Sequence, residues 1–166
     1  MTDKDRMIRW CKISAGRHDP YIWGAQGERL KNISIPALLK METSLDNALR
    51  VVKYVYYQIQ TGYDMNECRC FDCSGLMVYC LQKLGIIEHD YTAQGLYDIV
   101  KNHGKLRGSL KDIQRGDLIF RSTDGKIVHV GLYIENGEII EAKGRDYGVC
   151  ITNIRSARWD YCGDIF

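Results

Sequence analysis

The spacing of the apolar residues changes once along this chain, near Asp117, and that change limits the folds open to it. Before residue 117 apolar side chains recur at helical spacing, whereas after it they alternate with polar ones. The alternating part predicts strands over 117–120, 126–134, 138–142, 149–153 and 160–166. Helices followed by strands are typical of an α+β domain in which N-terminal helices pack on a C-terminal antiparallel sheet.

Four segments before residue 117 carry the boundary signals of helices. Each begins behind a residue whose side chain can cap a helix, and each ends at a glycine. The boundary pairs are Thr2 and Gly16, Thr43 and Gly62, Asp72 and Gly85, and Thr92 and Gly104. The second helix has an apolar stripe made of Leu45, Leu49, Val52 and Tyr56. We interpret this stripe as a packing face, with a wall of a substrate cleft as the alternative.

Length and charge exclude several classes of protein. A chain of 166 residues, 45% hydrophobic and 27% charged, suits one globular domain over residues 1–166. The net charge is +2 and the Lys and Arg residues are scattered, so no nucleic-acid partner is predicted. No apolar run is long enough to span a membrane, and the polar start of the chain lacks the features of a signal peptide. The sequence therefore predicts synthesis in the cytoplasm, and it leaves the oligomeric state open.

The seven cysteines predict free thiols rather than a disulfide framework. Their number is odd and their spacing is irregular, which is typical of a reducing compartment. Cys68, Cys70 and Cys73 are close enough in sequence to suggest a zinc site. No second pair at zinc-finger spacing follows them, so we predict neither a metal nor a cofactor.

The segment Phe71-Asp72-Cys73-Ser74-Gly75-Leu76 offers a thiol nucleophile. Cys73 lies in the first turn of the third predicted helix, where unpaired backbone N–H groups and the helix dipole favour an anion. We therefore expect the pKa of this thiol to fall. A candidate base, His129, lies on the predicted strand 126–134, and a thiol with a base is the minimum set for nucleophilic catalysis.

Alternation along the strand 126–134 sets the surroundings of His129. It places His129 and Tyr133 on one face. The other face, directed at the core, carries Val128, Val130, Leu132 and Ile134. Gly131, beside His129, is expected to leave room for the N-terminus of the Cys73 helix.

Glu141 is the predicted third group, which would hold the imidazole of His129. If Glu135-Asn136-Gly137 is a three-residue hairpin loop, the next strand pairs so that Glu141 lies on the His129 face. A two-residue loop would turn Glu141 away, and a surface glutamate is the alternative interpretation. A carboxylate at this place can accept the imidazole N–H and stabilise the imidazolium.

Several blocks of the sequence occur in an order that resembles a known family. They are Tyr21-Ile22-Trp23-Gly24, Phe71-Asp72-Cys73-Ser74-Gly75, Gln94, Arg115-Gly116-Asp117-Leu118-Ile119-Phe120 and His129-Val130-Gly131-Leu132-Tyr133-Ile134-Glu135-Asn136-Gly137. Together they resemble the NlpC/P60 family, whose members are papain-like cysteine peptidases that cut the stem peptides of bacterial peptidoglycan. The resemblance covers most of the chain and implies a single NlpC-type domain with a helical insertion at about 25–67.

The resemblance also implies roles for individual residues. Cys73 and His129 correspond to the catalytic pair, and Glu141 lies where the family most often has a histidine. Substrate binding is implied for Tyr21, Asp72 and Ser74. Core packing is the alternative for Tyr21, and capping of the Cys73 helix is the alternative for the other two.

The function expected from the resemblance is hydrolysis of an amide bond in peptidoglycan, between D-γ-glutamate and the diamino acid. The enzyme would be a phage or prophage lysin that acts on the cell wall after release or injection. A papain-like acyltransferase, or a deamidase or amidase effector, could use the same residues, but no long apolar segment that could form a groove is present. A non-catalytic tail or binding module would not require Cys73 and His129.

Overall fold

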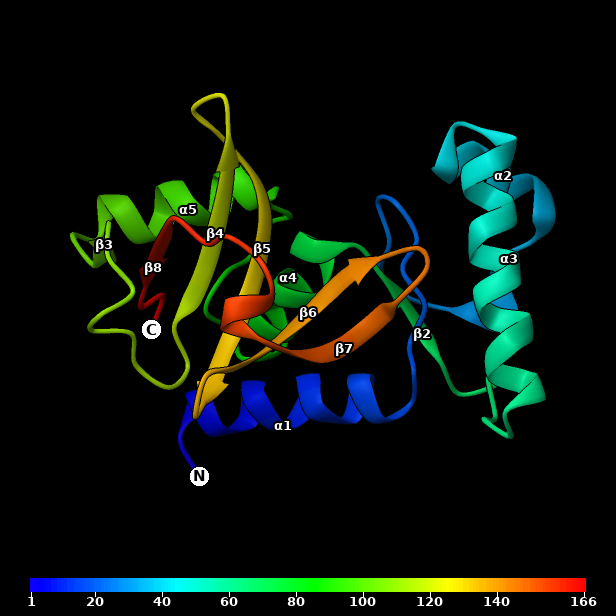
Figure 1. The fold of residues 1–166 in the computed structure, drawn as a ribbon, viewed down its shortest axis with the longest axis horizontal. Coiled ribbons are helices and arrows are strands. Elements are labelled where there is room, and N and C mark those ends of the chain that lie inside the picture. Colours follow the sequence, from blue (N-terminus) through cyan, green and yellow to red (C-terminus); the bar gives the residue numbers. More distant parts are fainter.

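The C-terminal half of the chain forms a six-stranded antiparallel sheet in the order β3-β8-β4-β5-β6-β7 (Figure 1). The structure is a computed structural model that describes residues 1–166. The strands are β3 (Leu106–Arg107), β4 (Leu118–Thr123), β5 (Lys126–Glu135), β6 (Glu138–Gly144), β7 (Gly148–Asn153) and β8 (Tyr161–Gly163). Five helices precede or cover this sheet, so the predicted α+β class is confirmed.

All five helices lie within the first 102 residues. They are α1 (Asp3–Gly16), α2 (Ile35–Glu42), α3 (Leu45–Gln60), α4 (Cys73–Lys83) and α5 (Ala93–Asn102). A small sheet of β1 (Gln26–Arg29) and β2 (Arg69–Phe71) and two short 3-10 helices, Leu30–Asn32 and Ile154–Ser156, complete the chain. None of the helices combines the length and the hydrophobicity needed to cross a bilayer.

Three of the four predicted helix caps are present, and the fourth is displaced. The side chains of Thr2, Asp72 and Thr92 accept backbone N–H groups at the starts of α1, α4 and α5. The predicted cap Thr43 instead ends α2, with a φ of 60°, and Ser44 caps α3. Helix α2 was not predicted, so Thr43, which ends this short helix, was assigned to the start of the next one.

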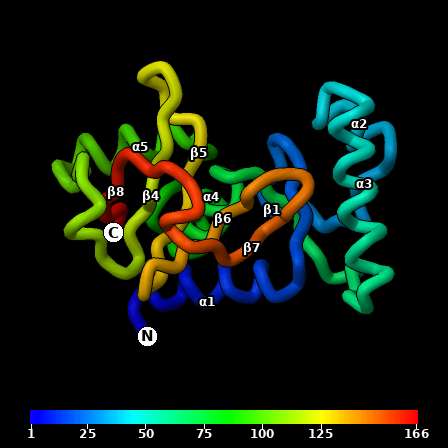
Figure 2. Tube along the Cα trace, viewed as in Figure 1, coloured from blue at the N-terminus to red at the C-terminus, as the bar shows by residue number.

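The apolar stripe predicted on α3 is not its packing face. The helix buries Ala48 and Val51 against Leu38 of α2, whereas Leu45 and Tyr56 keep 62% and 60% of their surface exposed. Ala48 and Val51 thus bring α3 close to α2, while Val52 and Tyr56 line a groove made only of apolar side chains. The helix pair α2–α3 therefore lies beside the main core as a separate layer (Figure 2).

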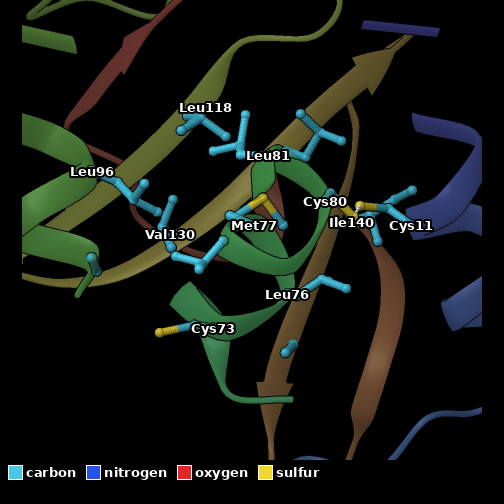
Figure 3. Packing of buried hydrophobic residues seen from close by; sticks show 14 of the residues in the cluster. Cys11, Cys73, Leu76, Met77, Cys80, Leu81, Leu96, Leu118, Val130 and Ile140 are labelled. Atoms are coloured by element: carbon cyan, nitrogen blue, oxygen red, sulfur yellow. Dashed lines mark hydrogen bonds between the residues drawn. The ribbon is translucent and has the colours of Figure 1, made fainter. Parts of the chain in front are cut away.

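Helix α4 lies at the centre of the main core. Its Met77 and Leu81 point toward Leu96, Leu118 and Val130, which come from α5, β4 and β5 (Figure 3). Seven of its eleven residues are buried. Burial of this many apolar side chains fixes α4 against the sheet, and its first residue is thereby held close to β5.

A bulge interrupts β5 just before His129. The pairing of β4 with β5 shifts by one residue between His129 and Ile127, so Val128 is an extra residue in the strand. Val128 is 50% exposed, and the prediction that it faces the core was wrong. The N–H of Ile127 donates to the side chain of Gln94 at 2.9 Å, which holds this end of β5 against α5.

The turn between β5 and β6 differs from the prediction but leaves the same residues opposite one another. It has two residues, Asn136 and Gly137, with φ angles of 53° and 80°, so the three-residue loop was wrong. A second bulge, between Tyr133 and Glu135, adds one residue to β5 and so makes up for the residue by which the turn is shorter than predicted. The two differences compensate, and Glu141 lies on the predicted face.

The glycine that permits close packing of α4 is Gly75 rather than Gly131. A Cβ on Gly131 would face the ring of Trp159 at 3.4 Å, not the helix. A Cβ on Gly75 would lie 2.1 Å from the carbonyl oxygen of Ala25, a distance that no rotamer change can relieve because the atom belongs to the backbone. The first turn of α4 therefore rests directly on the chain at residue 25.

Gly75→Ala should lower the free energy of unfolding by about 2–3 kcal/mol, because α4 must move away from Ala25. Urea denaturation measures this change. Gly16→Ala is the matched control: nothing lies within 4 Å of its Cβ position, so its stability should equal or slightly exceed that of the unchanged protein. Equal midpoints for the Gly75→Ala protein and the unchanged protein would contradict the packing described here.

Candidate active site

Cys73 is the first residue of α4, and its side chain lies against β5. Only 9% of the residue surface is exposed. The backbone N–H of Val130 is close enough to lower the pKa of the thiol, and Val130 directly follows His129. The fold therefore brings the predicted nucleophile beside the strand segment that carries the predicted base.

The pKa of the Cys73 thiol is raised to about 11, so the expectation of a lowered pKa was wrong. Burial is the largest cause and the Asp72 carboxylate is the second, while the N–H groups of Val130, Ser74 and Cys73 act in the opposite direction. Burial removes the water that would solvate a thiolate, and here this effect exceeds that of the helix N-terminus. The resting thiol is protonated near neutral pH and requires a base.

His129 and Glu141 form a buried pair across β5 and β6. Nε2 of His129 lies 2.7 Å from Oε2 of Glu141, and the side chains are only 7% and 3% exposed. Burial alone would raise the pKa of Glu141, but hydrogen bonds from His129 and Thr152 bring it below its usual value. Glu141 is thus an ionised acceptor and Nε2 of His129 carries the proton. Nδ1 remains as the ring nitrogen that can accept a proton.

Two residues that complete this pair were missed by the sequence analysis. The hydroxyl of Thr152 donates to Oε1 of Glu141 at 2.6 Å, and the ring of Trp159 lies 5.5 Å from the ring of His129. Thr152 could have been found, because Glu141 pairs with Cys150 and Thr152 is on the same face of β7. Trp159 lies between strands, where no periodic pattern indicates its direction.

Asp72 joins the start of α4 to the preceding chain. Its Oδ1 accepts the N–H of Gly75 at 2.7 Å and the hydroxyl of Ser74 at 3.2 Å, and its Oδ2 accepts the N–H of Gly24 at 2.9 Å. Burial raises the pKa of Asp72 although these donors oppose it. Both oxygens already have partners within the protein, as the capping alternative for Asp72 and Ser74 requires.

Tyr21 lies beside Cys73 and is nearly buried. Burial raises the pKa of the phenol strongly, and the neighbouring Cys73 thiol and Asp72 carboxylate add to the effect. Tyr21 therefore keeps its proton and can act as a hydrogen-bond donor near the thiol. It pairs with Phe71 in a single bridge, which fixes its backbone next to the start of α4.

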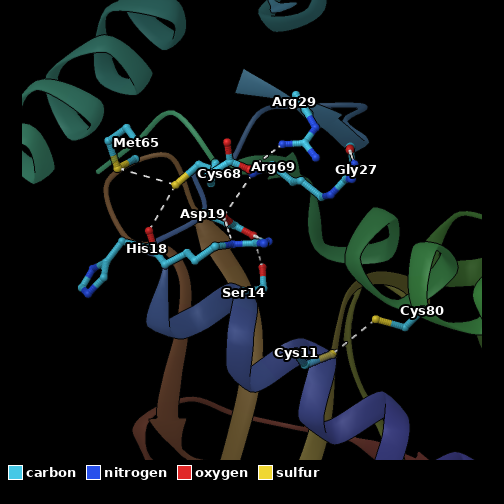
Figure 4. Close-up of polar contacts among 12 residues, drawn as sticks. Cys11, Ser14, His18, Asp19, Gly27, Arg29, Met65, Cys68, Arg69 and Cys80 are labelled. Carbon is cyan, nitrogen blue, oxygen red and sulfur yellow. Dashed lines mark hydrogen bonds and ion pairs between the residues drawn. The ribbon is translucent and has the colours of Figure 1, made fainter. Parts of the chain in front are cut away.

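The cysteines that suggested a zinc site do not converge. Cys68 packs with Met65 and donates to the carbonyl oxygen of Arg17 at 3.2 Å (Figure 4). Cys70 and Cys73 belong to two other apolar clusters. No group of three or more His, Cys, Asp or Glu side chains in the structure is arranged to hold a metal ion.

The sequence profile of the NlpC/P60 family matches residues 51–162, which is more than half of the chain. The match begins within α3 and includes the segments of Cys73, His129 and Glu141. Helix α2 and residues 21–24 lie before it.

Individual proteins resemble parts or all of the chain. Murein DD-endopeptidase MepH from Escherichia coli strain K12 is 34% identical over 91 residues, which are 54% of this chain and 32% of MepH. The chain thus corresponds to about a third of the length of this relative. The solved structure of NlpC2 from Trichomonas vaginalis has a TM-score of 0.58 and 26% identity, covering 96% of this chain and 45% of the other. The solved structure of the peptidoglycan hydrolase RipB from Mycobacterium tuberculosis has a TM-score of 0.63 and 23% identity. The match covers 99% of this chain and 65% of RipB, and it shows a shared fold.

The raised pKa of Cys73 predicts the pH dependence of its alkylation. Below a pKa of about 11 the thiolate fraction grows with pH, so labelling by iodoacetamide should accelerate roughly tenfold per pH unit from about 7 to 10. Mass spectrometry of peptides from the labelled protein gives the rate at each thiol. A His129→Ala variant should show the same profile. A rapid, pH-independent phase near pH 7 that disappears in His129→Ala would instead indicate a resting thiolate–imidazolium pair.

Proposed function

We propose that this chain, which belongs to the NlpC/P60 family, is a cysteine endopeptidase that hydrolyses amide bonds in peptidoglycan stem peptides. The observation that carries this proposal is the arrangement around the thiol. A cysteine at a helix N-terminus lies against the backbone N–H of Val130. The residue before Val130 is His129, whose Nε2 is held by the buried carboxylate of Glu141. This arrangement provides a nucleophile, a base and a group that stabilises the protonated base.

In the proposed mechanism, His129 acts first as a base. Its Nδ1 accepts the proton of the Cys73 thiol, and the resulting thiolate attacks the amide carbonyl carbon of the substrate. Glu141 stabilises the imidazolium through Nε2. The imidazolium then protonates the leaving amine as the carbon–nitrogen bond breaks, which leaves an acyl thioester on Cys73. Water, activated by neutral His129, hydrolyses this thioester and restores the thiol.

The negative oxygen of the tetrahedral intermediate needs hydrogen-bond donors. The N–H groups of Cys73 and Ser74 are in the first turn of α4, where N–H groups have no helical partner, and both act on the thiol. We propose the N–H of Cys73 as one donor and the hydroxyl of Tyr21 as the second. The phenol qualifies because its raised pKa keeps it protonated.

The scissile bond that we propose joins D-γ-glutamate to the diamino acid of the stem peptide. This choice follows the family resemblance, and fragment analysis of a digest tests it. The phage-lysin role and the action on the cell wall after release or injection stay predictions.

Purified peptidoglycan incubated with the protein should gain free amino groups and no reducing sugar ends, because the proposed residues contain no pair of carboxylates for glycoside hydrolysis. Amine derivatisation, a reducing-sugar assay and mass spectrometry of the fragments measure the three quantities. Cys73→Ala and Cys73→Ser should release no amines while melting near the temperature of the unchanged protein. Cys11→Ala, which removes a core thiol from α1, should lower the melting temperature and retain activity. Release of reducing ends alone, or acyl transfer to lipid without amine release, would contradict the proposal.

Glu141→Gln should lower kcat roughly a hundredfold or more and change KM little, because the imidazolium is stabilised mainly in the transition state. The decrease in kcat should be smaller than the decrease caused by Cys73→Ala. Glu138→Gln, an exposed carboxylate at the start of the same strand, is the matched control and should retain full activity. Steady-state kinetics on a stem peptide make the comparison, and a fully active Glu141→Gln enzyme would leave a Cys–His dyad.

A further inference from the structure

A buried ion pair links α2 to the hairpin between β6 and β7. Glu42, the last residue of α2, has a side chain with no exposed surface. It accepts the Nε–H of Arg145 at 2.5 Å and the backbone N–H of Trp23 at 2.9 Å. Both oxygens of this carboxylate therefore have partners, as burial of a charge requires.

Arg145 lies close to the thiol of Cys73. The guanidinium carbon of Arg145 is 5.5 Å from the centre of the Tyr21 ring. Tyr21 in turn forms a bridge with Phe71, two residues before Cys73, and both Tyr21 and Cys73 belong to the same buried cluster. Arg145 is thus separated from the thiol by little more than one side chain.

Only one edge of the Arg145 guanidinium is used within the protein. Its Nε donates to Glu42, whereas the two Nη atoms donate to no protein group. The side chain is 17% exposed, so solvent reaches part of it, and the Nη atoms are the polar part without a protein partner. The paired N–H groups of such an edge match the two oxygens of a carboxylate in a bidentate contact.

The helix pair α2–α3 holds the hairpin at a second place. Arg50 of α3 donates to both oxygens of Asp146, at 2.9 and 2.5 Å. A Cβ on Gly148 would lie 2.4 Å from the hydroxyl of Tyr54, so α3 also rests closely on the start of β7. Figure 1 shows the β6–β7 hairpin extending toward α2 and α3. These contacts hold the hairpin beside α3, whereas the Arg145 guanidinium itself is held by Glu42.

We propose that Arg145 binds a carboxylate of the substrate next to the scissile amide, and that Glu42 is the positioning residue that orients its guanidinium. This inference rests on the proposed peptidase function. A γ-linked glutamyl residue keeps its α-carboxylate free, separated from the scissile carbonyl by a short aliphatic chain. With that carbonyl at Cys73, the α-carboxylate reaches past Tyr21 to the free edge of Arg145.

Two stem peptides that differ only at this group test the inference. One carries the glutamyl α-carboxylate and the other the α-carboxamide. The unchanged enzyme should prefer the carboxylate peptide roughly ten- to hundredfold in kcat/KM, the range expected for a hydrogen bond to a charged group. The difference should lie mainly in KM, because the contact is made in the ground state as well as in the transition state.

The variants locate the preference within the structure. Arg145→Met should lose the preference for the carboxylate peptide, because kcat/KM should fall for that peptide and stay unchanged for the carboxamide peptide. Glu42→Gln can still accept the Trp23 N–H but turns an amide toward Arg145, so it should reduce the preference while sparing the carboxamide peptide. Arg50→Met is the matched control: it removes the other arginine that binds this hairpin, and the preference should remain.

Three results would overturn the inference. Equal cleavage of both peptides by the unchanged enzyme would exclude the carboxylate contact and leave the proposed peptidase function intact. An undiminished preference in Arg145→Met would exclude this residue. Cleavage of neither peptide would remove the proposed function and the inference with it. If Arg145→Met fails to fold in a thermal melt, Arg145→Lys replaces it, and should lose most of the preference because an ammonium lacks the paired N–H edge.

Discussion

The carboxylate of Asp72 is the contact on which the remainder of the site depends. A helix N-terminus leaves backbone N–H groups without helical partners, and Asp72 satisfies that of Gly75 while its other oxygen holds Gly24. Its own N–H donates to Ala25 at 2.9 Å, and Gly75 lets the two segments meet. The helix that carries the thiol and the segment that carries Tyr21 are therefore joined by one side chain.

The close packing that places Cys73 also determines its ionisation. The thiol is buried against β5 with a carboxylate next to it in sequence, and both features disfavour a thiolate. His129 lies in the neighbouring strand, and its Nε2 is held by the buried carboxylate of Glu141. The site thus combines a protonated resting thiol with an imidazole that is oriented by a buried carboxylate.

The helix pair α2–α3 makes specific contacts with the β6–β7 hairpin. Its apolar stripe is largely exposed, and half of it, Val52 and Tyr56, lines an open groove. Its packing on the domain therefore depends on other residues, such as Ala48 and Val51, and on polar contacts. Two of those contacts, from Glu42 and Arg50, reach the β6–β7 hairpin. Residues that lie far from this hairpin in sequence thereby hold Arg145 and Asp146 in place.

The sequence by itself determined the elements whose signals are local. The change of period near Asp117, the capping residues and the terminal glycines indicated the α+β class and most helix ends, because such signals act within one turn or one strand. They also placed Cys73 at a helix start. The face on which Glu141 lies was predicted correctly, although through a loop that the structure replaces with a shorter turn and a bulge.

Tertiary structure alone decided the properties that depend on neighbours distant in sequence. The pKa of Cys73 rose because several elements exclude water from it, and no local pattern reports the balance between burial and a helix N-terminus. The bulge at Val128 arises from pairing with another strand and from Gln94. The contact of Glu42 with Arg145 joins α2 to a hairpin about a hundred residues later, and only the packed fold brings these charges together.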